Sequence, residues 1–193
     1  MNKKAFHLVG LLVLALAVLP GVHAQEETKA DTVTKVEKFL SQRGTLLIKD
    51  FYEIGSLQGT LSTSATVQAV VITTSGARVR GVKFTRPTTS KYGRDQTGFI
   101  DEEELAEVIK SIDVITAEAE RLKGQKVEYK EVIFKTRGGV SLGFFQAGSE
   151  QNAFFQVNSS GSSDAIVFGE INLLKHLKVL LEKAQARLQE AVK

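Results

Sequence analysis

Two apolar stripes of identical spacing constrain the fold of this 193-residue chain more than any other feature. Each stripe advances by 3, 4, 3, 4 and 3 residues, which places its side chains on one face of an α-helix. A shift of 69 residues maps the first stripe onto the second, and Phe99 onto Phe168. The stripes consist of Leu105, Val108, Ile112, Ile115, Ala119 and Leu122, and of Leu174, Leu177, Leu181, Ala184, Leu188 and Ala191.

Short β-branched and apolar segments bounded by Gly, Ser or Pro precede each expected helix, and such segments are typical of strands. The segments are 45–54, 66–74, 78–85 and 97–100, then 126–136, 140–146, 153–157 and 165–168. The sequence therefore predicts an α+β fold of two tandem four-strand-plus-helix units (ββββα ×2) forming one domain. Antiparallel sheets would pack with the two long amphipathic helices. The expected units are 45–123 and 127–193, after a leader and short N-terminal helix at 25–44. Within the first unit, a hairpin at 75–77 joins the second and third strands.

Whether the two units are true duplications stays open at this point, because no single shift aligns their strands. A shift of 62 matches 74–76 to 136–138, but hairpins resemble one another generally. Ile109, Leu173 and Leu180 widen the stripes beyond a coiled-coil seam, which favours burial inside a domain. Pairing of the stripes between two chains, as a homodimer, stays an alternative.

Four acidic residues, 101–104, open the first long helix. Asp101 and Glu104 have the spacing of a capping box, and acidic residues suit the positive end of a helix dipole. Consecutive helical side chains point about 100° apart and cannot converge on one ion. We therefore expect a helix cap here, and no metal site.

The first 24 residues have the pattern of a secretory signal peptide. Lys3 and Lys4 precede the uncharged segment 8–19, and small residues lead to a cleavage site at Ala24-Gln25. Twelve apolar residues are few against the roughly 20 that span a bilayer, which argues against an uncleaved anchor. We expect an exported protein, periplasmic or secreted, with no transmembrane span in the mature chain.

Composition excludes several classes of function. The chain has no Cys, so thiolate catalysis and cysteine-bound metals are excluded. Its net charge of +3 falls by two when the signal peptide leaves, because Lys3 and Lys4 are removed with no acid. The mature protein is nearly neutral.

Catalytic motifs are missing from the sequence. His176 is the only histidine after residue 24, and no nucleophile elbow, Walker loop or zinc-protease motif occurs. A histidine-independent hydrolase or lyase would have to use carboxylates such as Asp50, Glu53, Glu128 and Glu131, which is the alternative we carry. The main expectation is a non-enzymatic binding or scaffold protein without a cofactor.

Two groups of residues are candidates for ligand binding. Phe144-Phe145 and Phe154-Phe155 each send one ring to either side of a strand, so one ring of each pair can face a ligand. A basic stretch at 78–94 contains no acid and can meet an anionic partner, although a charged edge strand is the simpler interpretation. The candidates are Arg78, Arg80, Arg86, Lys91, Tyr92, Arg94, Phe145 and Phe154.

At the level of element count alone, two strand-rich units that each end in a long helix resemble the duplicated arrangement of the Whirly single-stranded-DNA-binding proteins. The resemblance covers the mature chain and carries no residue over. It implies a nucleic-acid-binding protein of duplicated ββββα type as a further alternative, and export argues against nucleic acid. The partner we expect is an anionic envelope glycan or another protein.

Overall fold

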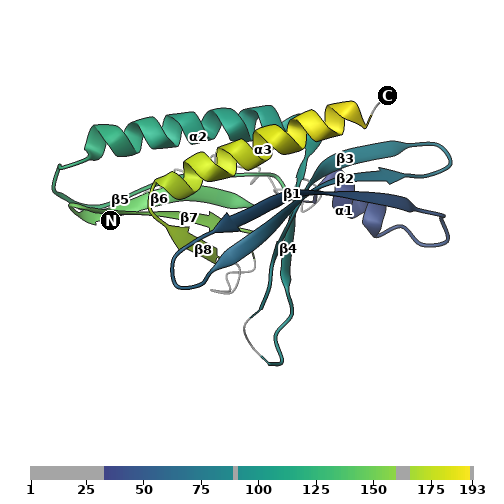
Figure 1. Cartoon of the computed structure of the whole chain (residues 1–193), viewed down its shortest axis with the longest axis horizontal. Coiled ribbons are helices and arrows are strands. Elements are labelled where there is room, and N and C mark those ends of the chain that lie inside the picture. The colour runs from purple at the N-terminus through teal and green to yellow at the C-terminus, as the bar shows by residue number, and fades with distance from the viewer. Residues whose placement is uncertain (1–32, 89–90, 160–165, 192–193) are drawn as a thin grey trace, which may run out of the picture.

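The computed structural model describes residues 33–88, 91–159 and 166–191, so the expected signal peptide lies outside the described residues. Two four-stranded antiparallel sheets are each followed by a long helix (Figure 1). The first group is β1 (Ile48–Gln58), β2 (Ser64–Thr73), β3 (Arg78–Arg86), β4 (Gln96–Asp101) and α2 (Glu102–Leu122). The second group is β5 (Val127–Lys135), β6 (Ser141–Gly148), β7 (Glu150–Gln156), β8 (Ile166–Gly169) and α3 (Asn172–Glu190). A short helix, α1 (Lys35–Leu40), precedes β1.

The predicted α+β class and the predicted order of elements are confirmed. Strands follow one another in chain order within each sheet, as the short expected hairpins require. The largest difference concerns β1, which begins three residues later than expected and continues to Gln58. A register shift between Glu53 and Gly55 lets β1 stay paired with β2 beyond Ile54.

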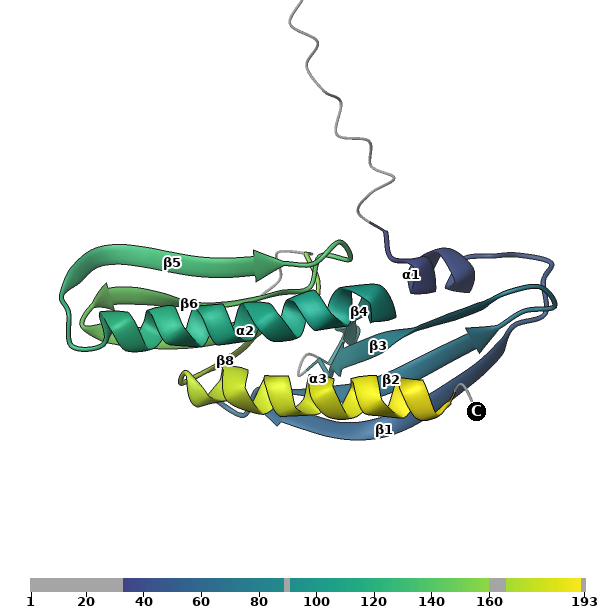
Figure 2. The same ribbon diagram turned by 90° about the horizontal axis from the view of Figure 1, so that it is seen from above.

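Each of the two long helices packs on the sheet of the other unit. α3 follows the second sheet but packs on β1 and β2 of the first, whereas α2 starts at β4 and runs along β5 and β6 of the second sheet (Figure 2). The helices lie side by side and run in opposite directions. The first sheet is therefore covered mainly by the helix of the other unit, whereas both helices share the second sheet.

One hydrophobic core joins both sheets and both helices, and the predicted stripes lie in it. All six stripe positions of α2 and the first five of α3 are buried, while Ala191 is half-buried just beyond the end of α3. The sheets meet through the rings of Phe84 and Phe155, whose centroids are 4.9 Å apart and tilted by 58°. Such a tilted pair is a favourable aromatic geometry.

α1 is fixed by a residue far away in the sequence. The buried Asp101 carboxylate accepts hydrogen bonds from the backbone nitrogens of Lys35 (2.7 Å) and Val36 (3.1 Å). The expected capping box at α2 is therefore wrong in its contacts, because Asp101 is the N-cap residue of α2 but its side chain serves α1. Glu104 instead accepts the backbone N–H of Arg137 at 3.0 Å.

The sheets approach closely where β4 passes the end of β7. A Cβ atom on Gly98 would lie 1.7 Å from the carbonyl oxygen of Val157, so only glycine fits there. Asn158 adds hydrogen bonds from its side-chain amide to Gln96 (3.1 Å) and to the carbonyl of Thr97 (3.3 Å).

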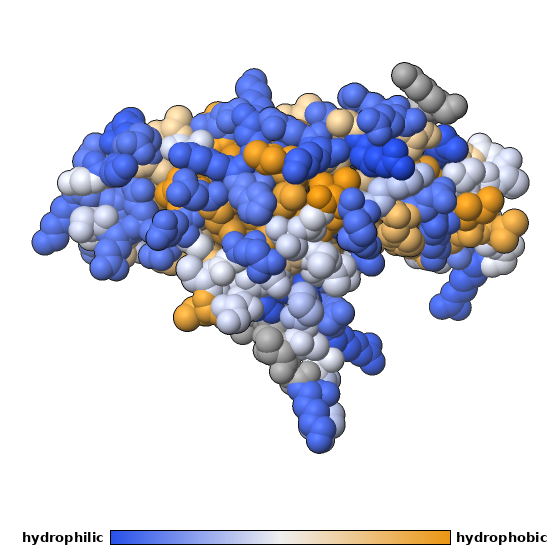
Figure 3. Space-filling view, viewed as in Figure 1, coloured by the Kyte–Doolittle hydropathy of each residue, from blue (hydrophilic) through white to orange (hydrophobic). Residues whose placement is uncertain are grey.

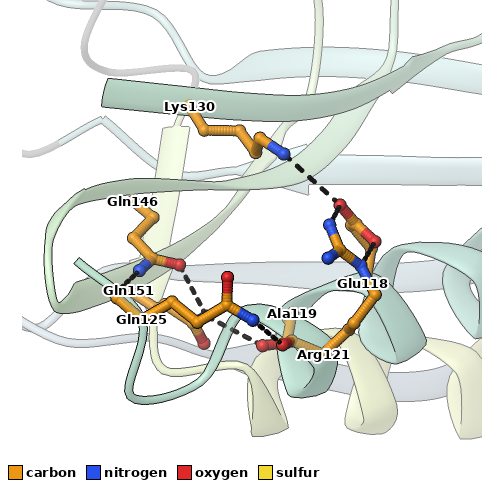
Figure 4. A network of polar contacts seen from close by, with 7 residues as sticks. All are labelled: Glu118, Ala119, Arg121, Gln125, Lys130, Gln146 and Gln151. Atoms are coloured by element: carbon orange, nitrogen blue, oxygen red, sulfur yellow. Dashed lines mark hydrogen bonds and ion pairs between the residues drawn. The ribbon is translucent and has the colours of Figure 1, made fainter. Parts of the chain in front are cut away.

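Buried amides attach the C-terminal end of α2 to the second sheet (Figure 4). Gln146, which is fully buried, donates to the carbonyl of Gln125 at 2.7 Å. Gln151 donates to the carbonyl of Ala119 at 2.8 Å and to the side-chain oxygen of Gln146 at 2.9 Å. The bond from Gln151 gives a partner to the last-turn carbonyl of the buried Ala119, and the bond from Gln146 holds the segment that follows α2.

α3 begins differently from the expectation. Gly169 belongs to β8, and the N-cap residue is Ile171, which makes no side-chain cap bond. In the part of the chain that the structure describes, no helix combines the length and apolar character needed to cross a bilayer.

Candidate functional site

The strand arginines face the helices. Arg78, Arg80 and Arg86 share the side of β3 that also carries the buried core residues Val82 and Phe84. Arg86 is 7% exposed. The three residues lie on one side of β3, as their even spacing along the strand predicts. They form no shared exposed surface, however.

Arg78 and Arg80 contact the ends of the two long helices. Arg78 Nη1 donates to the carbonyl oxygen of Ala191 at 3.3 Å, just beyond α3. Arg80 Nε lies 2.7 Å from Glu102 Oε2, on the first residue of α2. A cation at a helix C-terminus and an acid at a helix N-terminus both complement the helix dipole. Their observed contacts are structural.

The remaining basic candidates lie on the β3–β4 connection. Lys91, Tyr92 and Arg94 are exposed, and Lys91 Nζ lies 5.5 Å from the centroid of the Tyr92 ring. The connection projects from the body of the molecule as a mostly hydrophilic arm (Figure 3). None of these three residues lines the hollow that contains Phe145 and Phe154, which is described below, so the structure does not bring the two groups of candidates together.

Phe145 and Phe154 face outward from the second sheet, as alternation along the strands predicts. Phe144 and Phe155 are fully buried on the helix-facing side, while Phe145 and Phe154 are half-buried on the opposite side. We call that opposite side the outer face of the second sheet. The register pairs Phe154 with Phe168 of β8, which adds a third ring to this face.

A hollow lies among these rings. It has a volume of about 300 Å³, at the small end of the range of small-molecule sites. Gly143 lies opposite both Ile133 and Phe154 in the register, so no side chain stands between these two residues. We call it the aromatic hollow; it is lined by Tyr129, Glu131, Ile133, Lys135, Ser141, Phe145, Phe154, Gln156, Ile166 and Phe168.

Tyr129 forms one wall of the aromatic hollow. Its ring stacks on Phe145 with centroids 6.5 Å apart, and its hydroxyl donates a hydrogen bond to Glu131. That hydrogen bond is the main reason why the pKa of Tyr129 is raised above its usual value, with burial and the negative charge of Glu131 adding to it. Tyr129 is 59% exposed, so its ring is open to a ligand.

A second hollow, of about 320 Å³, lies at the β5–β6 turn. It shares Lys135, Ser141 and Gln156 with the aromatic hollow, so the two are continuous along the outer face. We call it the cationic hollow; its lining is Lys135, Thr136, Arg137, Gly139, Ser141, Gln156 and Ser159.

The aromatic hollow and the cationic hollow together form a groove along the outer face. Sequence reasoning missed most of the residues that line this groove. Ile133, Lys135, Phe168 and Arg137 were not among the expected site residues, although β5 alternation places Tyr129, Glu131, Ile133 and Lys135 on one side. The signal that could have found them is the register of the β5–β6 hairpin, which its 136–140 turn determines.

The carboxylates of the enzyme alternative do not gather. Asp50 and Glu53 lie on β1 and Glu128 and Glu131 near or on β5, in different sheets. Glu53 accepts a hydrogen bond from Gln68 at 2.5 Å. Among residues 33–88, 91–159 and 166–191, no group of three His, Asp or Glu side chains could hold a metal ion.

Comparison with protein-family models, curated proteins and solved structures finds no match to this chain. The interpretation of the site therefore rests on its own geometry and chemistry.

Proposed function

We propose that this protein is an exported, non-enzymatic binding protein that holds a saccharide on the outer face of its second sheet. The observation that carries the proposal is the aromatic hollow, in which Phe145, Phe154 and Phe168 stand half-exposed on the outer face of the second sheet. The core uses Phe144 and Phe155 instead. Soluble proteins rarely leave aromatic side chains clustered on a surface without a binding role.

Sugars match both kinds of group in the hollow. The apolar faces of sugar rings pack on aromatic rings, and the few polar groups among them can orient hydroxyls. Glu131 accepts hydrogen bonds, Ser141 can donate and accept, and the Gln156 side-chain amide can donate. A nearly neutral mature chain also lacks the overall charge that drives binding to nucleic acid.

Export supports the same assignment. The N-terminal segment 1–24 has the pattern of a secretory signal, and glycans are abundant outside the cytoplasm. A second copy of the chain is the competing occupant of the outer face. Light scattering decides between them, because a monomer at working concentration leaves the face open.

The proposal is tested with the mature chain, beginning at Gln25, on an array of immobilised oligosaccharides. Phe145→Ala and Phe154→Ala should each weaken binding about 10- to 100-fold, since each removes a ring worth about 1.5–3 kcal/mol of apolar contact. Phe51→Ala is the matched control, because Phe51 is 45% exposed on the first sheet, with Lys83 Nζ 5.3 Å from its ring centroid. Unchanged binding in both hollow variants would contradict the proposal.

We also propose that the two ββββα units descend from one duplicated segment. The same order of elements in both halves and the equal spacing of the two buried stripes support this origin. Related sequences that align 45–123 with 127–193 over strands as well as helices would establish it.

A further inference from the structure

The groove on the outer face changes character along its length. The aromatic hollow is surrounded by aromatic rings together with Ile133 and Ile166. The cationic hollow is surrounded by two cationic and three hydroxyl side chains. Because Lys135, Ser141 and Gln156 line both, a ligand of two or more units can contact both at once.

The cationic hollow has positive charge with little local compensation. Its lining contains Lys135 and Arg137 and no acidic residue. Lys135 is exposed, and within the described ranges it has no ion pair. Arg137 has two acidic neighbours: Glu103, whose Oε1 lies 3.9 Å from Nη1 and which also pairs with Lys35 at 2.5 Å, and Glu104, whose Oε1 accepts the Arg137 backbone N–H. The charge of Lys135 is thus available to an anion, and Arg137 adds the part of its charge that the two glutamates leave uncompensated.

Polar donors surround the same place. The hydroxyl of Thr136 is buried and has no hydrogen-bond partner among the residues that the structure describes. The Ser141 hydroxyl donates to Gln156 Oε1 at 3.1 Å, which leaves the Gln156 amide N–H groups as donors. A buried hydroxyl without a partner is costly, and an anionic oxygen would satisfy it.

The turn that carries these groups is held in shape. Thr136 N donates to the carbonyl of Val140 at 2.8 Å, and Arg137 N donates to Glu104 Oε1 at 3.0 Å. Gly139 has a φ of +79°, and a Cβ there would lie 2.8 Å from Ser159 Oγ. Glycine thus permits both the turn and the close approach of Ser159. A preformed site loses less entropy when it binds.

We infer that the ligand is an acidic oligosaccharide, with one sugar ring on the aromatic hollow and the carboxylate or sulfate of a neighbouring unit in the cationic hollow. This inference rests on the proposed function and specifies its ligand. Lys135 and Arg137 supply charge, and Thr136 and Gln156 supply hydrogen-bond donors.

The test compares three probes with equal chain length: a galacturonate oligosaccharide, a sulfated galactose oligosaccharide and a neutral galactose oligosaccharide. Calorimetry at low salt should show at least one acidic probe binding about tenfold tighter than the neutral probe. The preferred acid distinguishes a carboxylate from a sulfate. Added salt should reduce the difference.

Lys135→Gln and Arg137→Gln should each remove most of the preference for the acidic probe. Arg137→Gln should leave binding of the neutral probe unchanged, because Arg137 lines the cationic hollow and not the aromatic hollow. Lys126→Gln, at an exposed lysine outside the groove, is the matched control. If the neutral probe binds as tightly as both acidic ones, or the two variants keep the preference, the inference is overturned and the proposed function stands. If none of the probes binds, both fail.

Discussion

Asp101, the last residue of β4, holds the first turn of α1 through the backbone nitrogen of Lys35, at 2.7 Å from its Oδ2. These residues are 66 positions apart. Asp101→Ala should lower the free energy of unfolding by about 1–3 kcal/mol, because two backbone N–H groups lose a buried charged acceptor. Urea denaturation measures the loss, and hydrogen exchange should accelerate selectively in α1.

Asp50→Ala is the control for this change, since Asp50 is exposed on β1. Equal stability of the Asp101 and Asp50 variants would refute the capping role.

Arg78 should act on stability and not on ligand binding. Arg78→Ala removes the cation from the carbonyl of Ala191 and should lower the free energy of unfolding by about 0.5–1 kcal/mol. Exchange of the last-turn amides of α3 should accelerate, while affinity for oligosaccharides stays the same. Arg94→Ala, on the exposed β3–β4 connection, should change neither quantity; a loss of binding with Arg78→Ala would show that the residue has a second role.

Among the polar residues that contact the C-terminal end of α2, Gln146 on β6 should contribute most to stability. Gln146→Leu keeps the size of the side chain but leaves the carbonyl of Gln125 without its donor, so we expect a loss of about 1–3 kcal/mol. Thermal denaturation against Gln58→Leu, at an exposed position, checks this. A stable Gln146 variant would mean that water replaces the amide.

Glu118 should titrate far below an ordinary glutamate. Two hydrogen bonds of 2.6 Å from Arg121, with Lys130 Nζ at 3.6 Å, lower its pKa to about 2. A carboxylate with a lowered pKa stabilises the fold above its unfolded pKa, and that contribution disappears as the pH falls toward 2. Carboxyl NMR titration measures the pKa, and Arg121→Ala should raise it toward the usual value, whereas Lys183→Ala should not.

The pKa of Tyr129 should lie above its usual value, because its hydroxyl donates a hydrogen bond to Glu131. Glu131→Gln should lower the pKa of Tyr129 toward about 10, since the negative charge that opposes ionisation is gone. Absorbance titration follows it, and Tyr129→Phe identifies its component among the three tyrosines. A pKa that does not change in the Glu131 variant would place the hydroxyl elsewhere.

Local periodicity determined how much could be predicted. The helical stripes and the outward rings of Phe145 and Phe154 follow from periods of 3.6 and 2 residues, which are written directly in the sequence. The alternation of residues along β3 does not predict which side of the strand is buried, because Val79 and Val82 place apolar side chains on opposite sides. The arginines therefore looked like a possible ligand surface, whereas they point toward the helices.

Contacts between residues that are far apart in the sequence could not be predicted from local periodicity. The role of Asp101 depends on the position of α1, and the aromatic hollow depends on four strands whose registers bring Ile133, Phe154 and Phe168 beside Gly143. Neither relationship has a local signature, since both arise from tertiary packing.

The two halves of the chain are complementary fragments, because α3 packs on the first sheet and α2 packs on the second. A cut within 123–126 would leave one fragment with α2 and the first sheet, and another with α3 and the second sheet. The first sheet would lose α3, its main cover, and the second sheet would lose the part that α2 covers. Mixed in solution, the fragments should reassemble into the native molecule, so the protein can serve as a split reporter in which each half is silent alone.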